Sequence, residues 1–275
     1  FIVIVTLLPL RVLYILSDIL YIILLYLPSY RKKVVETNLK NAFPEKSDAE
    51  RKHIRNKFYR HLADMFIETF KARNISRKEL EKRFTYTQSG IDLVNRLHDE
   101  KRDIIAVLGH YNNWELSVLL GEKIKSKAYV IYKPLMNKYF DRHINSQRTR
   151  FGLGISPMSS VIRDILKARK EKINTISLFI SDQSPPRNEI QYWTTFLNQE
   201  TPVYTGAAKI ASKYSMAVVF IHITKKKRGH YNFDIEPLVE DAGGMPEDVI
   251  TEKHVRRLEE IIRDKPEYWL WSHKR

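Results

Sequence analysis

The sequence contains no cysteine. Disulfides, thiolate metal sites and a covalent acyl-cysteine intermediate are therefore excluded. The chain also lacks a Gly-x-Ser-x-Gly nucleophile elbow, a Walker A phosphate loop and any His-Glu-x-x-His metal spacing among its 9 histidines. Gly152-Leu153-Gly154 begins a dinucleotide fingerprint, but the third glycine is missing. The sequence thus gives no support to hydrolases with that elbow, P-loop enzymes, zinc proteases or dinucleotide-dependent enzymes.

No uninterrupted apolar run reaches the ~20 residues that a clean membrane-spanning helix needs. Residues 1–30 come nearest, because Arg11 and Asp18 are their only charged side chains and three basic residues follow at 31–33. This order is typical of a segment whose following chain stays in the cytoplasm. We expect residues 1–30 to be embedded in a membrane or to lie on it. The alternative is an apolar helix pair packed on the core, whereas a signal peptide is disfavoured because no small-residue cleavage site precedes residue 31.

Acidic residues are scarce relative to basic ones: 32 Asp and Glu stand against 47 Lys and Arg, giving a net charge of +15. Such a balance predicts an anionic partner, which could be a nucleic acid, a membrane or an acidic protein. Residues 31–83 carry 16 basic and 8 acidic residues, or 8 of the 15 excess charges. Ser47 and Glu50 form the pattern of a capping box, followed by apolar residues at helical spacing. We expect a basic amphipathic helical segment over 31–83, with a polar connection at 34–46.

Residues 84–275 alternate between short apolar runs and amphipathic stretches. The runs predict strands and the stretches predict helices, an order typical of an α/β fold with a mixed, mostly parallel sheet flanked by helices. Because no internal repeat divides this part, we expect one α/β domain over 84–275. The predicted strands are 104–108, 128–132, 175–181, 217–224 and 231–235, and the predicted helices are 114–124, 137–151, 159–168, 202–214 and 247–263.

A turn between a predicted strand and helix carries His110 and, five residues later, Glu115. Ligands of α/β folds usually bind at such turns, outside the carboxyl ends of the strands. An imidazole accepts a proton near neutral pH, and a nearby carboxylate fixes its tautomer and stabilises its charged form. The pair could therefore activate a hydroxyl for attack on an acyl group.

This turn resembles the His-x4-Asp/Glu signature of the glycerolipid and lipid A acyltransferases. Further segments resemble other blocks of the late lipid A acyltransferases, with a Bacteroidetes-like pattern, and together they cover nearly the whole chain. Two departures are notable: Lys133 stands where many relatives carry arginine, and Glu115 is the glutamate variant of the signature. The matching segments are 38–44, 132–138, 148–152, 181–185, 194–206 and 269–273.

The resemblance implies a membrane-bound enzyme on the cytoplasmic face of the inner membrane. It would transfer a fatty acyl chain from acyl carrier protein to a hydroxyl of a lipid A precursor, without a metal or an organic cofactor and without a nucleic-acid partner. His110 would be the general base, and Glu115 would hydrogen-bond its other ring nitrogen.

The tetrahedral intermediate of acyl transfer needs donors for its oxyanion. We expect Arg150 to supply them, with Lys133 and backbone N–H groups as alternatives. Asp182 and Gln183 end a predicted strand, where Asp182 could anchor Arg150 or a sugar hydroxyl. Two further residues, Thr205 and Gly206, begin a predicted helix whose free N–H groups suit a phosphate.

Three other functions fit the same residues. The acceptor could be another lipid, such as a glycerophospholipid, an aminolipid or a glycosylated phosphoinositide, since acceptor choice depends on pocket shape. The His–Glu pair could instead activate water, which would make the protein a thioesterase. A basic membrane-anchored protein that binds lipid or nucleic acid without turnover would need neither residue.

Overall fold

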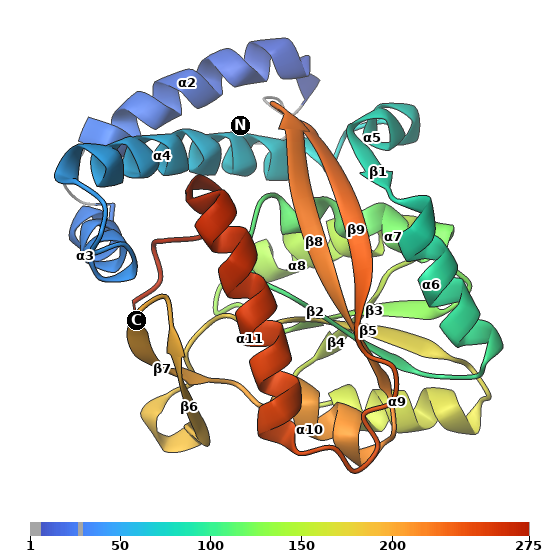
Figure 1. Ribbon diagram of the computed structural model, residues 1–275. Coiled ribbons are helices and arrows are strands. Elements are labelled where there is room, and N and C mark those ends of the chain that lie inside the picture. The colour runs from blue at the N-terminus through green and yellow to red at the C-terminus, as the bar shows by residue number, and fades with distance from the viewer. Residues whose placement is uncertain (1–6, 27–29, 275) are drawn as a thin grey trace.

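The computed structural model describes residues 7–26 and 30–274 and builds them around a seven-stranded sheet (Figure 1). Neighbouring strands are parallel except for the antiparallel hairpin of β8 and β9. The predicted α/β fold with a mixed, mostly parallel sheet is therefore confirmed. In spatial order the strands are β1 (Phe84–Tyr86), β9 (His230–Val239), β8 (Ala217–Lys227), β2 (Ile104–Leu108), β5 (Thr175–Ile180), β3 (Lys127–Tyr132) and β4 (Gly154–Pro157).

Helices cover both faces of the sheet, because its central strands are apolar on both sides. In β2, Ile105 and Val107 join one buried core, while Ile104, Ala106 and Leu108 join the other. This double burial explains why the central strands read as continuous apolar runs. The first core is closed by α3 (Lys32–Ala42), α4 (Asp48–Lys71), α9 (Val161–Lys170), α10 (Gly206–Lys213) and α11 (Glu247–Asp264), and the second by α5 (Arg77–Arg83), α6 (Gln88–Asp99), the 3-10 helix η1 (Trp114–Leu119) and α7 (Leu120–Lys123).

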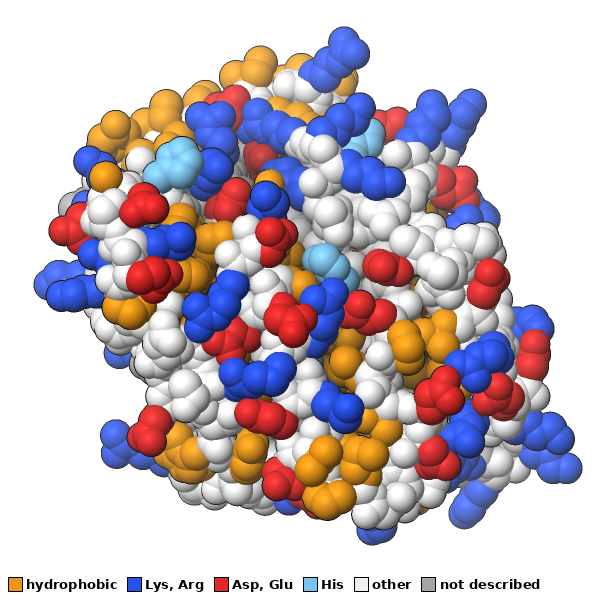
Figure 2. Space-filling model, viewed as in Figure 1, with side chains coloured by type: hydrophobic (Ala, Val, Ile, Leu, Met, Phe, Trp, Pro, Cys, Tyr) orange, Lys and Arg blue, Asp and Glu red, His pale blue; other side chains and the backbone are white. Residues whose placement is uncertain are grey.

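Helix α2 (Leu10–Tyr26) lies along α4 at the edge of the molecule (Figure 1). Its outer face is apolar and exposed, and orange side chains gather over it in Figure 2. Among the described residues, no helix is both long and apolar enough to cross a membrane. Residues 1–6 and 27–29 of the predicted membrane segment lie outside the described part. The exposed apolar side chains of α2 are Val12, Ile15, Leu16, Ile19, Ile22, Ile23 and Tyr26.

The predicted polar connection at 34–46 is wrong for most of its length, because α3 occupies residues 32–42. Val35, Leu39 and Ala42 are buried on one face of this helix at a spacing of four and three residues. Only three apolar residues mark that face, so the helical periodicity of this segment was too weak to predict a helix. The capping box at the start of α4 is confirmed, since Ser47 and Glu50 exchange both hydrogen bonds.

An antiparallel ribbon, β6 (Tyr192–Phe196) and β7 (Gln199–Val203), includes the first two residues of the helix predicted at 202–214. The helix there, α10, begins only at residue 206. Leu197 and Asn198 form the ribbon's two-residue turn, with positive φ angles of 50° and 62°. Neither residue is glycine, so the turn lacked the signal that usually marks a hairpin.

The predicted helix 137–151 is α8 (Lys138–Arg148) followed by a 3-10 turn, η2 (Thr149–Phe151), and the predicted helix 114–124 begins as the 3-10 helix η1. The chain closes with α11 and a 3-10 turn, η4 (Pro266–Tyr268). The tail after η4 runs back over the carboxyl ends of the central strands. Its buried tryptophans, Trp269 and Trp271, pack against each other with ring centroids 4.8 Å apart. The C-terminal residues are therefore part of the core.

We predict that His254 makes the free energy of unfolding depend on pH. Burial in α11 lowers the pKa of His254 from 6.5 to about 4, so the folded protein resists its protonation while the unfolded chain does not. Stability is therefore complete above pH 6.5 and falls as the pH drops towards 4. Between pH 7 and pH 5 this histidine alone should cost about 2 kcal/mol. Urea unfolding at both pH values should show a smaller loss for His254→Gln than for wild type, and equal losses would contradict the prediction.

Candidate active site

The predicted turn after β2 lies at the carboxyl edge of the sheet and is tightly packed. A Cβ atom on Gly109 would lie 2.6 Å from Cδ1 of Leu258, so the backbone approaches α11 as only glycine allows. Asn112 has a φ of 54°, and its Nδ2 donates to the carbonyl of Ile223 at 2.6 Å. Packing and this side-chain bond together fix the course of the turn around His110.

His110 and Asp182 meet because their strands are parallel neighbours in register. Leu108 of β2 pairs with Ile180 of β5, and each functional residue follows its strand by two positions. The ring Nδ1 of His110 lies 2.5 Å from Oδ1 of Asp182, and the backbone N–H of His110 donates to Oδ2 at 2.9 Å. An ionised carboxylate can only accept hydrogen bonds. The neutral ring of His110 therefore carries its proton on Nδ1, which leaves a lone pair on Nε2.

Asp182 is also held by the C-terminal tail. The indole Nε1 of Trp269 donates to Oδ2 of Asp182 at 2.8 Å, and the backbone N–H of Leu270 donates to the carbonyl of His110 at 3.0 Å. The Asp182 side chain is 1 % exposed. Three N–H donors around one buried carboxylate favour its charged form and fix its orientation.

The other side of the imidazole faces outward, where its side chain is 15 % exposed. The amide nitrogen of Gln183 lies 3.5 Å from Nε2 of His110 and 3.2 Å from Nε2 of His273. The rings of the two histidines stand at 88° with centroids 5.1 Å apart. His273 was not among the residues predicted for the site. Its signal in the sequence was the final block 269–273, which had been used only as a family resemblance.

Glu115 does not make the hydrogen bond to the imidazole that the sequence analysis assigned to it. In the structure Asp182 makes that hydrogen bond. Glu115 instead forms a bidentate ion pair with Arg148 of α8, whose Nη2 lies 2.7 Å from Oε1 and whose Nε lies 3.1 Å from Oε2. The 3-10 turn at η1 brings the Glu115 carboxylate to α8. Trp114 lies between the two groups, since its ring contacts that of His110 at 4.8 Å and its Nε1 donates to Glu115 at 3.2 Å.

A narrow pocket opens beneath this ion pair. Glu115 and Arg148 provide its charged groups, and most of its wall is aliphatic. Of the guanidinium nitrogens of Arg148, Nη1 has no hydrogen-bond partner in the described part of the chain. The pocket encloses about 20 Å³, little more than the space of one water molecule, so it is a narrow, mostly apolar slot with one charged end. The remaining lining residues are Leu108, Trp114, Ser117, Val118, Val130, Leu153, Leu178 and Ile180.

The other predicted site residues lie apart from this pocket. Arg150 donates to the carbonyls of Ala72 and Arg73 at 3.1 Å each, so it caps the end of α4. Lys133 is exposed directly after β3.

Thr205, which precedes Gly206 at the start of α10, lines a separate polar pocket. Glu247 and Asp248 also line it, and their negative charges oppose the binding of a phosphate there. The geometry therefore brings together His110, Asp182 and Gln183 but not the other predicted residues. Across residues 7–26 and 30–274, no three His, Asp or Glu side chains are grouped to hold a metal ion.

Comparison with known proteins identifies the family of the chain. No curated protein matches the chain. The sequence model of one family, described as bacterial lipid A biosynthesis acyltransferase, matches residues 1–275, which is the whole chain. With a histidine–carboxylate pair beside an aliphatic pocket at the edge of an α/β sheet, the chain belongs to the bacterial lipid A biosynthesis acyltransferase family.

Proposed function

We propose that this acyltransferase moves a fatty acyl chain from the thioester of acyl carrier protein to a hydroxyl of a lipid A precursor, with His110 as the general base. The observation that carries the proposal is the arrangement of the imidazole. Its Nδ1 faces the buried carboxylate of Asp182, and its Nε2 faces the surface beside Gln183. This is the geometry of a base that receives a proton from outside.

The acceptor hydroxyl is a poor nucleophile at neutral pH, and Nε2 of His110 removes its proton as the oxygen attacks the thioester carbonyl. A C–O bond forms. When the tetrahedral intermediate collapses, the C–S bond breaks and the imidazolium returns the proton to the departing thiolate. Asp182 stabilises the imidazolium in between. Transfer is direct, so it needs no covalent acyl-enzyme, in keeping with a chain that has no cysteine.

The aliphatic lining supports the same reaction, because a fatty acyl chain that widens this pocket would place its thioester near the charged end. Arg148 then supplies the oxyanion donor through its unpartnered Nη1, and Glu115 holds the guanidinium in place. Glu115 would thus act through Arg148 rather than through the ring of His110. A guanidinium aimed at the developing charge is a strong form of transition-state stabilisation.

The exposed face of α2 supports attachment to a membrane. Its isoleucines and leucines form an apolar surface, and Lys226 and Lys227 are exposed on the neighbouring hairpin β8–β9 (Figures 1 and 2). Apolar side chains flanked by basic ones fit the boundary between acyl chains and anionic headgroups. We therefore propose that residues 1–30 are a membrane anchor or a membrane-lying helix, that 31–83 form a basic amphipathic helical segment and that 84–275 form the catalytic domain, on the cytoplasmic face of the inner membrane.

His110→Ala and Asp182→Asn test the proposed reaction. We expect His110→Ala to lower kcat by about 10²–10⁴-fold, the usual contribution of a general base. Asp182→Asn should cause a comparable loss, because an amide at that position supports the wrong tautomer. The measurement is acyl transfer from labelled acyl carrier protein to a purified lipid A precursor, with products resolved by mass and folding checked by circular dichroism.

The products separate the alternative functions. One added acyl chain, formed by wild type only, supports the proposal. Free fatty acid in the presence of the acceptor would show a thioesterase. Acyl transfer to a glycerophospholipid or aminolipid added beside the precursor, with the precursor left unchanged, would show another acceptor. Full activity of a folded His110→Ala protein would overturn the role of His110.

Arg148→Met and Arg150→Met form a matched pair that locates the oxyanion donor. Removing one such donor typically lowers kcat by about 10²–10³-fold, and we expect that loss for Arg148→Met. Arg150→Met removes a cap from α4, so it should lower the melting temperature with little change in kcat. Steady-state kinetics and thermal unfolding of both variants provide the test. The reverse pattern would assign the donor role to Arg150.

The double substitution Ile15→Glu/Ile19→Glu tests the membrane-facing role of α2. These side chains are 62 % and 50 % exposed, so the change should leave the fold intact. Burial of an isoleucine side chain is worth about 1.5–3 kcal/mol, so the two together should weaken binding to anionic vesicles by about 100-fold or more. Ile162→Glu on α9, a site that is 43 % exposed and lies away from α2, is the control for flotation assays. Equal binding by all three proteins would exclude α2 as the contact.

A further inference from the structure

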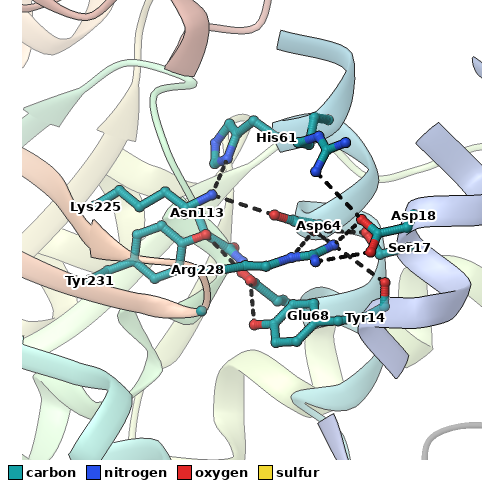
Figure 3. A network of polar contacts seen from close by, with 12 residues as sticks. Tyr14, Ser17, Asp18, His61, Asp64, Glu68, Asn113, Lys225, Arg228 and Tyr231 are labelled. Atoms are coloured by element: carbon teal, nitrogen blue, oxygen red, sulfur yellow. Dashed lines mark hydrogen bonds and ion pairs between the residues drawn. The ribbon is translucent and has the colours of Figure 1, made fainter. Parts of the chain in front are cut away.

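A buried polar network lies outside the active site, where α2, α4 and the hairpin β8–β9 meet (Figure 3). At its centre is Glu68 of α4, whose side chain reaches in among three other elements. Figure 3 shows Tyr14 of α2, Tyr231 of β9 and Asn113 of the active-site turn pointing at its carboxylate. One carboxylate therefore joins the apolar outer helix to the segment that carries His110.

The contacts of Glu68 are short and use both oxygens. Oε1 accepts from the hydroxyl of Tyr14 at 2.9 Å. Oε2 accepts from Nδ2 of Asn113 and from the hydroxyl of Tyr231, both at 2.8 Å. Glu68 is 4 % exposed and Asn113 is fully buried. Because a buried carboxylate is costly without its donors, the loss of any one of them should change how the side chain is held.

Each side chain of residues 110–113 is held by a different part of the fold, and the hydroxyl of Tyr111 lies 3.1 Å from the carbonyls of both Ile261 and Lys265. His110 is held by Asp182, and the side chain of Asn112 is held by the carbonyl of Ile223. Asn113 is the residue of the turn whose side chain bonds to α4. A shift of Glu68 therefore moves the end of the turn where η1 begins, and with it Trp114 beside the imidazole.

At its other end the network fixes α2. Oδ1 of Asp64 accepts from Ser17 at 2.8 Å and from Arg228 at 2.7 Å, and Arg228 also reaches Asp18 at 2.8 Å. The guanidinium of Arg228 lies over the ring of Tyr14, 4.4 Å from its centroid. The polar side of α2 is thus bound to the protein by hydrogen bonds and ion pairs, while its apolar side is exposed. Tyr14 is the residue of α2 that contacts Glu68.

We propose that Glu68 is a positioning residue for the turn 109–113, and that its bond to Tyr14 makes the placement of His110 depend on how α2 is seated. The catalytic part of this inference rests on the proposed function. The structural part, the coupling of α2 to the turn 109–113 through Glu68, does not. It concerns only which segment is loosened when the hydroxyl of Tyr14 is removed.

Hydrogen exchange provides the first test, and it needs no substrate. In the full chain, Tyr14→Phe should raise amide exchange in the peptide covering 109–116 by about tenfold, although this peptide is nearly a hundred residues away in sequence. Tyr59→Phe is the matched control. It removes a buried tyrosine hydroxyl from α4 that donates to the carbonyl of Tyr30 at 3.0 Å, outside the Glu68 network. The control should leave exchange in 109–116 unchanged.

Kinetics provide the second test. Tyr14→Phe and Glu68→Ala should lower kcat for acyl transfer by about tenfold or more with little change in KM. Tyr14→Phe should cause no further loss in a Glu68→Ala background, because the two residues act in series. Glu68→Gln keeps one acceptor oxygen for Asn113, so it should retain more activity than Glu68→Ala.

Each outcome decides the inference. Exchange in 109–116 that is unchanged in Tyr14→Phe, or raised equally in Tyr59→Phe, would overturn it. Multiplicative losses of kcat in the double variant would reduce Glu68 to a structural role. Exchange that responds as expected in a protein without transfer activity would keep the positioning role and reject the proposed function.

Discussion

The carboxylate of Asp182 is the group on which the site depends. It is almost completely buried, and it binds the ring and the backbone of His110 and the indole of Trp269. A single side chain therefore joins the end of β5, the turn after β2 and the C-terminal tail. Because a buried charge needs all of its partners, these three segments hold one another in the arrangement that leaves Nε2 of the imidazole available.

The sheet makes this arrangement possible. Parallel strands β2 and β5 stand in register, so the residues two positions beyond each strand meet at the same edge. The C-terminal tail then covers this edge with Trp269 and places His273 across from His110. In this way the candidate active site is built from three parts of the chain that lie far apart in sequence, and its apolar pocket is lined by side chains of β2, β3 and β5 together with η1 and α8.

Helix α2 combines two environments. Tyr14 and Ser17 donate to the buried acids Glu68 and Asp64, and Asp18 pairs with Arg228. The opposite face exposes isoleucine and leucine. The apolar surface is therefore carried by a helix whose position is fixed by hydrogen bonds rather than by packing alone. The position of α2 is therefore well defined, because hydrogen bonds and ion pairs are directional. The loss of one donor changes how the shared carboxylate is held.

Local patterns in the sequence determined the α/β fold, the capped helix α4 and the position of His110 after a buried strand, since each depends on neighbours within a few residues. They did not determine the partner of the imidazole. Spacing favoured Glu115, but Asp182 reaches the ring because strand register brings together residues 72 positions apart, while η1 carries Glu115 to Arg148. The roles of the C-terminal tail and of the Glu68 network were likewise decided by tertiary structure, because the donors of a buried carboxylate come from whichever elements pack around it.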